Sequence, residues 1–175
     1  VPKDLQDAAD QVIVFEDSRI GWAGGFREYV SSLYAGRVPR WDLSKLRAAG
    51  VRLKTFGGRA SGPEPLADLL TFTRELFLRA AGRRLTTLEC HDLVCKIADI
   101  VVVGGVRRSA LISLSDLEDE GIRYAKHGRW WENAPHRALA NNSAVYTTKP
   151  PTGTYMREML SLYDSQSGER GVFNR

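Results

Sequence analysis

The sequence predicts an α/β protein, and three observations carry that prediction. Segments 18–36, 64–81 and 87–103 repeat apolar residues at the spacing of an amphipathic helix. The stretch "SALISL" at 109–114 instead alternates apolar and polar residues, which is typical of a half-buried strand. The chain of 175 residues is long enough to bury the core of one large domain or two small ones. A mixture of helices and short strands implies the α/β class.

Composition and charge restrict the function classes. Hydrophobic residues make up 43% of the chain and charged residues 26%, as in ordinary globular proteins. No apolar run approaches the ~20 residues of a bilayer span, so no membrane partner is expected. The net charge of +4 favours anionic partners such as nucleotides, but no basic block indicates nucleic acid. Cys90 and Cys95 are expected to remain unpaired, which indicates a reducing, cytoplasmic location.

The ends of the chain indicate an internal fragment. The first residues, "VPKDLQDAAD", are polar and acidic, so no signal peptide is expected. An initiator Met is missing, and the sequence stops abruptly after "GERGVFNR".

The first predicted helix spans 18–36, with Ser18 as its cap and Gly36 as its stop. Segment 40–58 is expected to form two short extended pieces around an Ala-Ala-Gly turn. A second helix is expected at 64–81, because Ser61 and Glu64 have the spacing of a capping box.

Segment 86–103 has two readings. "IADIVVV" alone resembles a buried strand, which would make the following glycines a phosphate-binding turn. Thr86 and Glu89, however, form a second capping box. The helical spacing then continues through one apolar stripe, so a helix at 87–103 is preferred; the stripe comprises Cys90, Leu93, Val94, Ile97, Ala98 and Val101.

The second half of the chain begins with the strand at 109–114, which places the two arginines before it in a helix-to-strand loop. A polar helix is expected near 116–128, and an irregular aromatic stretch at 129–139. Segment 140–146 reads as a loop, and 152–165 as a helix.

Three stretches could bind a ligand, and each has a plainer explanation. The glycines of "TFGGRASGPEPL" let a ligand approach the backbone, or they form an ordinary turn before a helix. "GGVRRSA" is either an anion-reading loop or a turn with solvated arginines. The amides of "ANNSAV" could read polar ligand groups, although the composition is also common in turns. The histidines and cysteines have no metal-ligand spacing, so no metal site is predicted.

Taken in order, four motifs resemble the large chain of adenosylcobalamin-dependent (class II) ribonucleotide reductases, in the monomeric triphosphate branch with its phage relatives. They are "LKTFGGRASGPEPL", "VVVGGVRRSALISL", "ANNSAV" and "SGERGVFNR". The resemblance implies part of a ten-stranded α/β barrel in 51–175. It also implies a helical effector-site insertion and lead-in in 1–50, with the helix at 22–33 holding the effector.

The family makes 2′-deoxyribonucleotides by thiyl-radical chemistry, with adenosylcobalamin as cofactor. The resemblance implies a ribonucleoside triphosphate substrate, a deoxynucleotide effector and a thioredoxin-type reductant. The family's thiyl cysteine lies in an Asn-Pro-Cys motif that this sequence lacks, and Cys90 and Cys95 match none of its redox cysteines. No catalytic residue is therefore assigned, and the fragment alone is expected to be inactive.

Recognition residues can be carried over from the family. The allosteric specificity loop, which couples effector identity to substrate choice, would comprise Gly104, Gly105, Val106, Arg107, Arg108, Ser109 and Ala110. The substrate-binding residues would be Gly57, Gly58, Arg59, Ser61, Gly62, Asn141, Asn142 and Ser143. The alternatives are an unrelated nucleotide- or phosphate-binding α/β module without catalysis, and a structural domain with solvated basic residues.

Overall fold

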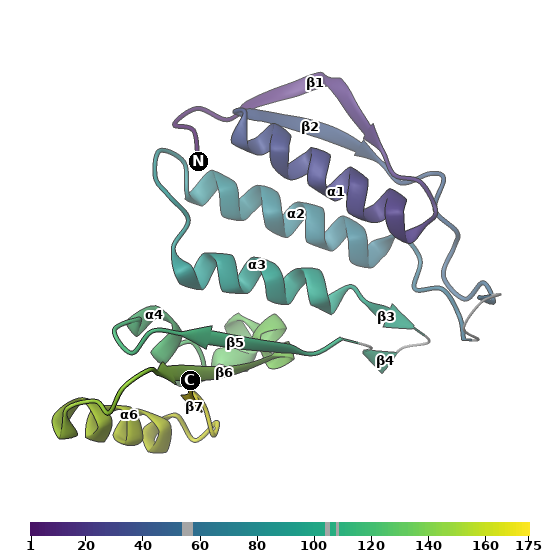
Figure 1. Ribbon diagram of the computed structural model, residues 1–175. Helices are drawn as coiled ribbons and strands as arrows, with labels where there is room; N and C mark the ends of the chain where they lie inside the picture. The colour runs from purple at the N-terminus through teal and green to yellow at the C-terminus, as the bar shows by residue number, and fades with distance from the viewer. Residues whose placement is uncertain (54–57, 104–105, 108) are drawn as a thin grey trace. The chain divides into compact units, whose positions relative to one another are not determined.

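The computed structural model describes all residues except 54–57, 104–105 and 108. The chain forms two compact units. One consists of residues 1–85 and 100–108, and the other consists of residues 86–99 and 109–175. Each unit combines helices with strands, and the longer strands run parallel (Figure 1), which confirms the α/β class. Within the described residues, no helix is long and apolar enough to cross a membrane.

The first unit opens with a β–α–β arrangement. Strands β1 (Gln6–Val14) and β2 (Arg37–Asp42) pair in parallel and are joined by helix α1 (Arg19–Tyr34). The predicted cap of α1 is confirmed, since the Ser18 hydroxyl accepts a hydrogen bond from the Gly21 N–H at 2.9 Å. The sequence did not predict β1, and residues 1–50 are not helical throughout. The effector role of this region stays a prediction.

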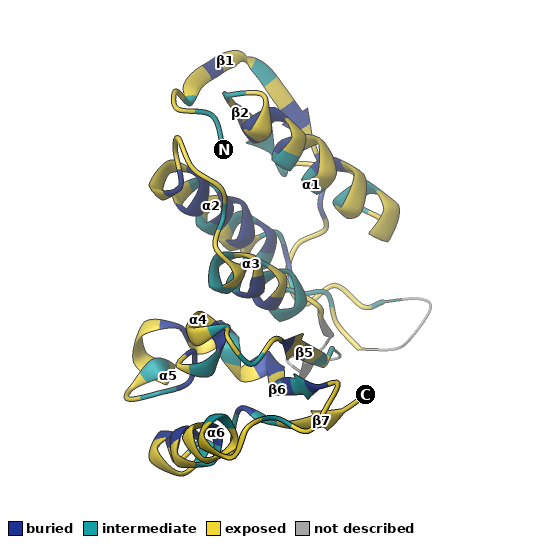
Figure 2. Ribbon diagram, turned by 60° about the vertical axis from the view of Figure 1, so that its left-hand side comes forward, coloured by how far each residue is buried: buried dark blue, intermediate teal, exposed yellow. Residues whose placement is uncertain are grey.

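Helix α2 (Glu64–Arg79) buries one face and exposes the other (Figure 2). Its predicted start at residue 64 is confirmed and its end lies two residues before the predicted one, but the predicted capping box is wrong. The N-cap is Pro63, which makes no side-chain cap, so Ser61 and Glu64 form no capping box. Gly62 before it has a φ of +83°, a left-handed conformation that redirects the chain into the helix. The buried face consists of Leu66, Leu69, Leu70, Thr73, Leu76 and Phe77.

The second unit begins with helix α3 (Thr87–Asp99). The predicted capping box is confirmed: Thr86 Oγ1 accepts from the Glu89 N–H at 3.1 Å, and Glu89 Oε2 accepts from the Thr86 N–H at 2.8 Å. The predicted stripe is wrong, because Cys90 and Val94 are exposed while His91 and Cys95 are buried. Of the two cysteines, Cys95 is a core residue and Cys90 is exposed.

Beyond α3, the expected helix to residue 103 is also wrong. Strands β3 (Val102–Val103) and β4 (Val106–Arg107) pair antiparallel, so a short hairpin stands where a helix-to-strand loop was expected. The hairpin forms its own two-stranded sheet, and "IADIVVV" is accordingly not a central strand. Gly104, Gly105 and Arg108 lie outside the described residues.

A three-stranded parallel sheet forms the framework of the second unit, in the order β5-β6-β7. Its strands are β5 (Leu111–Ser115), β6 (Ala140–Tyr146) and β7 (Gly171–Asn174). Short helices connect β5 to β6, namely α4 (Glu120–Arg123), α5 (Trp130–Asn133) and the 3₁₀ helix η1 (Pro135–Leu139). Helix α6 (Thr152–Ser165) connects β6 to β7. The strand at 109–114 and the helix at 152–165 are confirmed, whereas 140–146 is a central strand and not a loop.

Candidate functional site

The motif "ANNSAV" lies on β6, and its side chains alternate between the two faces of the sheet. Asn141 is exposed and Ser143 is half-buried, whereas Ala140, Asn142 and Ala144 between and beside them are buried. Two predicted substrate residues, Asn141 and Ser143, thus share one face.

The face that carries Asn141 and Ser143 is open. Asn141 lies opposite Ile112 of β5, and Ser143 lies between Leu114 of β5 and Gly171 of β7. Ile112 is 71% exposed and Leu114 is 47% exposed. Amide and hydroxyl groups flanked by accessible apolar side chains can hold a ligand that is partly polar and partly apolar, as many small-molecule sites do.

Asn142 points the other way, toward helix α3. Its side chain is 1% exposed, and its Oδ1 atom lies 2.9 Å from Nε2 of His91, which is 7% exposed. The Asn142 amide is therefore engaged inside the unit and does not share the open face with Asn141. Of the three predicted substrate residues on β6, Asn141 and Ser143 face the open side of the sheet and Asn142 faces α3.

A buried ion cluster surrounds His91. Nδ1 of His91 lies 3.5 Å from Oδ1 of Asp92, and Sγ of Cys95 lies 3.7 Å from Nδ1. Burial alone would lower the pKa of His91, but the hydrogen bonds with Asp92, Cys95 and Asn142 outweigh it and raise the pKa to about 9. Asp92 also receives two hydrogen bonds from Arg137, each 2.6 Å long.

The pKa of Asp92 moves in the opposite direction. Burial would raise it, but hydrogen bonds with Arg137, His136 and His91 hold it well below its usual range. Nε2 of His136 lies 3.3 Å from Oδ1 of Asp92. Asp92 is consequently an anion that orients three basic side chains, two of them from η1.

Glu169, from the motif "SGERGVFNR", secures the beginning of β6. Its Oε2 atom accepts a hydrogen bond from the Asn142 N–H at 3.0 Å, at a position one residue before the ladder to β7 starts. The same oxygen lies 2.9 Å from Nζ of Lys126, which also donates to the Ala140 carbonyl. Glu169 thus accepts a hydrogen bond from the Asn142 N–H, one residue before the pairing of β6 with β7 begins.

Arg170 ties β7 to the helices of the unit. Its guanidinium contacts both carboxylate oxygens of Glu158 on α6, at 3.0 and 2.9 Å. It also donates to Oγ of Ser115 at 3.0 Å and to the carbonyls of Asp116 and Leu117 at 2.8 and 2.9 Å. Arg170 and Glu158 are both buried, so this pair holds the sheet to α6 rather than facing a ligand.

The predicted glycine loop belongs to the first unit. The Leu53 N–H donates to the Gly58 carbonyl at 3.0 Å, and Arg52 and Arg59 form an antiparallel bridge, so residues 52–53 pair with residues 58–59. Gly58 and Gly62 have φ values of +85° and +83°. Arg59 is exposed and donates to the Gly50 carbonyl at 2.8 Å, Ser61 is half-buried, and Gly57 lies outside the described residues.

The predicted specificity loop coincides with the β3–β4 hairpin. Val106 and Arg107 form β4, and Ala110 is exposed just before β5. Ser109 anchors the exit of the hairpin in the second unit, since its Oγ atom donates to the Ala98 carbonyl at 2.7 Å. The ends of the segment are thus held, one by β3 and one by Ser109.

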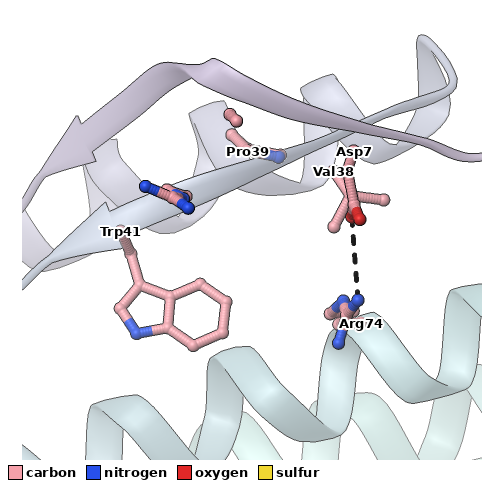
Figure 3. Close-up of a pocket in the computed structure, with 7 residues that line it drawn as sticks. Asp7, Val38, Pro39, Trp41 and Arg74 are labelled. Atoms are coloured by element: carbon pink, nitrogen blue, oxygen red, sulfur yellow. Dashed lines mark ion pairs between the residues drawn. The ribbon is translucent and has the colours of Figure 1, made fainter.

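A pocket of about 360 Å³ in the first unit was not predicted. In Figure 3 the Trp41 indole lies beneath β2, and Arg74 rises from α2 toward Asp7, 3.7 Å away. Arg40 also lines the pocket, together with Ala9, Val38 and Pro39. The Trp41 ring is fixed by an edge-on contact with Tyr29 at 5.7 Å. Two guanidiniums beside an indole suit an anionic aromatic ligand.

Sequence reasoning missed the residues that support the site. His91, Asp92 and Lys126 carry no recognisable motif, because the partners that join them to the rest of the unit are distant in sequence; these are Asn142, Arg137 and Glu169. Glu169 lies in the motif "SGERGVFNR", and that motif is the sequence signal that points to it.

Comparisons with known proteins agree with the resemblance. An adenosylcobalamin-dependent ribonucleoside-triphosphate reductase from Lacticaseibacillus paracasei is 31% identical over 164 residues, covering 90% of this chain and 21% of the relative. The reductase of the same name from Lactobacillus delbrueckii subsp. bulgaricus is 30% identical over 176 residues, covering 97% and 23%. A Mycobacterium phage D29 protein described as the same kind of reductase is 42% identical over 120 residues, covering 61% and 17%. No family model matches the chain.

A solved structure supports the same assignment. A B-12 dependent (class II) ribonucleotide reductase aligns with a TM-score of 0.78 and 25% identity, over 99% of this chain and 23% of that one. The fold is therefore that of a part of a class II reductase, a partial α/β barrel. The chain spans about a fifth of the length of the curated relatives it matches. It belongs to the adenosylcobalamin-dependent, class II ribonucleotide reductase family.

Proposed function

We propose that the full-length protein containing this chain is an adenosylcobalamin-dependent ribonucleoside-triphosphate reductase. The observation that carries the proposal is a double match: relatives of that name align with 90% and 97% of the chain, and a class II fold aligns with 99% of it. An unrelated nucleotide-binding module would not be expected to match these reductases both in sequence and in fold. The reaction replaces the ribose 2′-hydroxyl by hydrogen, with electrons from a dithiol.

The open face of the β5-β6-β7 sheet is the part of this chain that we assign to the substrate. Asn141 and Ser143 offer hydrogen bonds to the ribose or base, and Ile112 and Leu114 offer apolar contact. In the first unit, the loop of Gly58, Arg59, Ser61 and Gly62 is proposed to contact the same nucleotide, because its left-handed glycines allow close backbone approach. Asn142 is removed from the set of direct contacts, because its side chain is buried against His91.

The hairpin segment 104–110 is proposed as the specificity element. Its support is that a pair of arginines lies beside two glycines in a segment held at both ends, by β3 and by the Ser109 hydrogen bond. Glycines permit backbone conformations that other residues rarely adopt, so a sequence with two glycines before two arginines suits an element that responds to two ligands.

The deoxynucleotide effector is proposed to bind in the region of residues 1–50. The pocket of Arg40, Trp41 and Arg74 supports this placement, because it offers cationic groups for phosphates and an indole for a base. Direct binding of a deoxynucleoside triphosphate to the full-length protein tests it. Arg74→Ala should weaken binding, whereas Arg79→Ala on the same helix should not; equal affinities would move the effector elsewhere.

Adenosylcobalamin is not assigned to any described residue. The pocket in the first unit does not fit a corrin ring, because it holds only about 360 Å³ and is lined by two arginines and an aspartate. A thioredoxin-type reductant and a monomeric state are proposed for the whole protein, as for the branch that the sequence resembles.

Reductase activity of the full-length protein tests the proposal. The protein is incubated with ribonucleoside triphosphates, adenosylcobalamin and a dithiol, and deoxynucleotides are quantified by chromatography. Product should form only when both the cofactor and the dithiol are present. Folded protein that binds cobalamin and yields no deoxynucleotide would contradict the assignment.

A further inference from the structure

The side chains on the two faces of β6 are attached to the same backbone. Asn141 and Ser143 face the open side, and Asn142 between them is anchored on the covered side to His91. Because neighbouring side chains on a strand share peptide planes, whatever fixes Asn142 also fixes the directions of Asn141 and Ser143.

The anchor is built from charged groups rather than from apolar packing. Nε2 of His91 faces Oδ1 of Asn142 at 2.9 Å, and Nδ1 faces Oδ1 of Asp92 at 3.5 Å. Both ring nitrogens thus lie near side-chain oxygens, an arrangement that the doubly protonated imidazolium satisfies with two N–H donors. Asp92 is held in turn by two 2.6 Å hydrogen bonds from Arg137, whose Nη1 also donates to the Ala125 carbonyl at 2.7 Å.

A second anchor reaches the backbone of the same residue. The Asn142 N–H donates to Glu169 at 3.0 Å, and Lys126 contacts both Glu169 and the Ala140 carbonyl. Side chain and main chain of Asn142 are therefore held from two directions, by α3 and by the segment before β7. No apolar contact could set the orientation of this strand as narrowly, since hydrogen bonds are directional.

We propose that His91 is a positioning residue for the substrate: through Asn142 it sets the orientation of Asn141 and Ser143 on the open face. This inference rests on the proposed function, in which Asn141 contacts the ribonucleotide. His91 touches no substrate itself. Its contribution is to keep the outward side chains in the geometry that binds the nucleotide.

A double-mutant cycle in the full-length reductase tests the proposal. Asn141→Ala and His91→Gln should each raise the KM for the ribonucleoside triphosphate, by about tenfold, with little change in kcat, because each removes binding rather than chemistry. In the double variant the KM should rise by clearly less than the product of the two single increases, since part of the His91 effect passes through the contact that Asn141→Ala has already removed. His127→Gln is the matched control: it alters another histidine of the same unit, which contacts Ser161 at 3.1 Å.

A second pair of variants covers the case in which His91→Gln does not fold. Asn142→Asp keeps an oxygen acceptor for His91, whereas Asn142→Leu removes it, so only the latter should raise the KM. Such rescue by the conservative variant would not follow from a merely structural role, which lowers the amount of active enzyme and leaves the KM unchanged.

The possible failures are distinguishable. An unchanged KM in Asn141→Ala overturns the substrate assignment, and the positioning role with it. Additive effects of Asn141→Ala and His91→Gln on the KM overturn the positioning role alone. An equal KM for Asn142→Asp and Asn142→Leu also overturns it.

Discussion

Nε2 of His91 lies 2.9 Å from Oδ1 of Asn142, although 51 positions separate the two residues in the chain. The contact joins the capped helix α3 to the central strand β6, and it places a buried cation directly behind the open face of the sheet. We therefore expect the stability of the second unit and its pH dependence to depend on this histidine.

The first prediction concerns pH. The hydrogen bonds of His91 raise its pKa from the ordinary value of 6.5 to about 9. The imidazolium therefore stabilises the folded unit fully below pH 6.5, and this stabilisation is lost as the pH rises through about 9. At about 1.4 kcal/mol per pKa unit, its size is on the order of 3 kcal/mol.

Hydrogen exchange of the amides in β6 measures this effect in the full-length protein, after correction for intrinsic exchange rates. Wild type should be better protected than His91→Gln at pH 6, and the difference should shrink toward pH 9. A Cys95→Ala background removes the neighbouring thiol. A difference that is constant across this range would show that His91 is not charged in the folded unit.

The second prediction concerns Gly62. Its φ is +83°, and an added Cβ would lie 3.1 Å from the Ala49 nitrogen and 2.4 Å from Oε2 of Glu64. Gly62→Ala should therefore cost about 1–2 kcal/mol of stability in the first unit and should raise the substrate KM. Gly153→Ala in α6 is the control, because nothing lies within 4 Å of its added Cβ and its backbone is helical.

Thermal unfolding and steady-state kinetics of both glycine variants provide the measurement. Gly153→Ala should be neutral or slightly stabilising, as alanine is in a helix. Equal behaviour of the two variants would mean that the left-handed turn before α2 is unimportant to the site.

The third prediction concerns the hairpin arginines. Removing a charge-assisted hydrogen bond costs about 1.5–3 kcal/mol, enough to abolish a typical coupling of about 1–3 kcal/mol between two sites. Arg107→Ala or Arg108→Ala should thus weaken the influence of the effector on substrate choice more than it weakens the protein. Arg129→Ala is the control, since Arg129 is exposed and pairs with Glu132 three residues away.

Competition among the four ribonucleotide substrates, with and without each deoxynucleotide effector, reveals the change. Substrate preferences that respond to effectors as in wild type, in both arginine variants, would mean that the hairpin is a plain turn with solvated arginines.

Local capping signals in the sequence correctly predicted the N-termini of α1 and α3. The caps at Ser18 and Thr86 lie within three residues of their partners, so the sequence contains the whole interaction. The box at Ser61 failed because the left-handed Gly62 and the cap at Pro63 set the start of α2 instead. The prediction of a helix to residue 103 was wrong because apolar spacing alone does not exclude a strand at Val102–Val103 that pairs with Val106–Arg107.

The central strand and the anchor could not be found locally. Segment 140–146 contains turn-forming Asn141, Asn142 and Ser143, and it becomes a strand because β5 and β7 pair with it on both edges. Likewise, the partners of Asn142 come from positions 91 and 169, which no pattern in the sequence connects. The family resemblance, by contrast, rested on long ordered motifs and is confirmed.

The most direct test of the account compares Asn141→Ala with Asn133→Ala in the full-length protein. Both asparagines are exposed in the second unit, but only Asn141 lies on the open face of the sheet, while Asn133 lies on α5. The measurement is the KM for a ribonucleoside triphosphate in adenosylcobalamin-dependent reduction. We expect a KM about tenfold higher in Asn141→Ala and an unchanged KM in Asn133→Ala, because only the former loses one or two hydrogen bonds to the nucleotide. An unchanged KM in Asn141→Ala, in protein that is folded and active, would contradict the claim that this face binds the substrate.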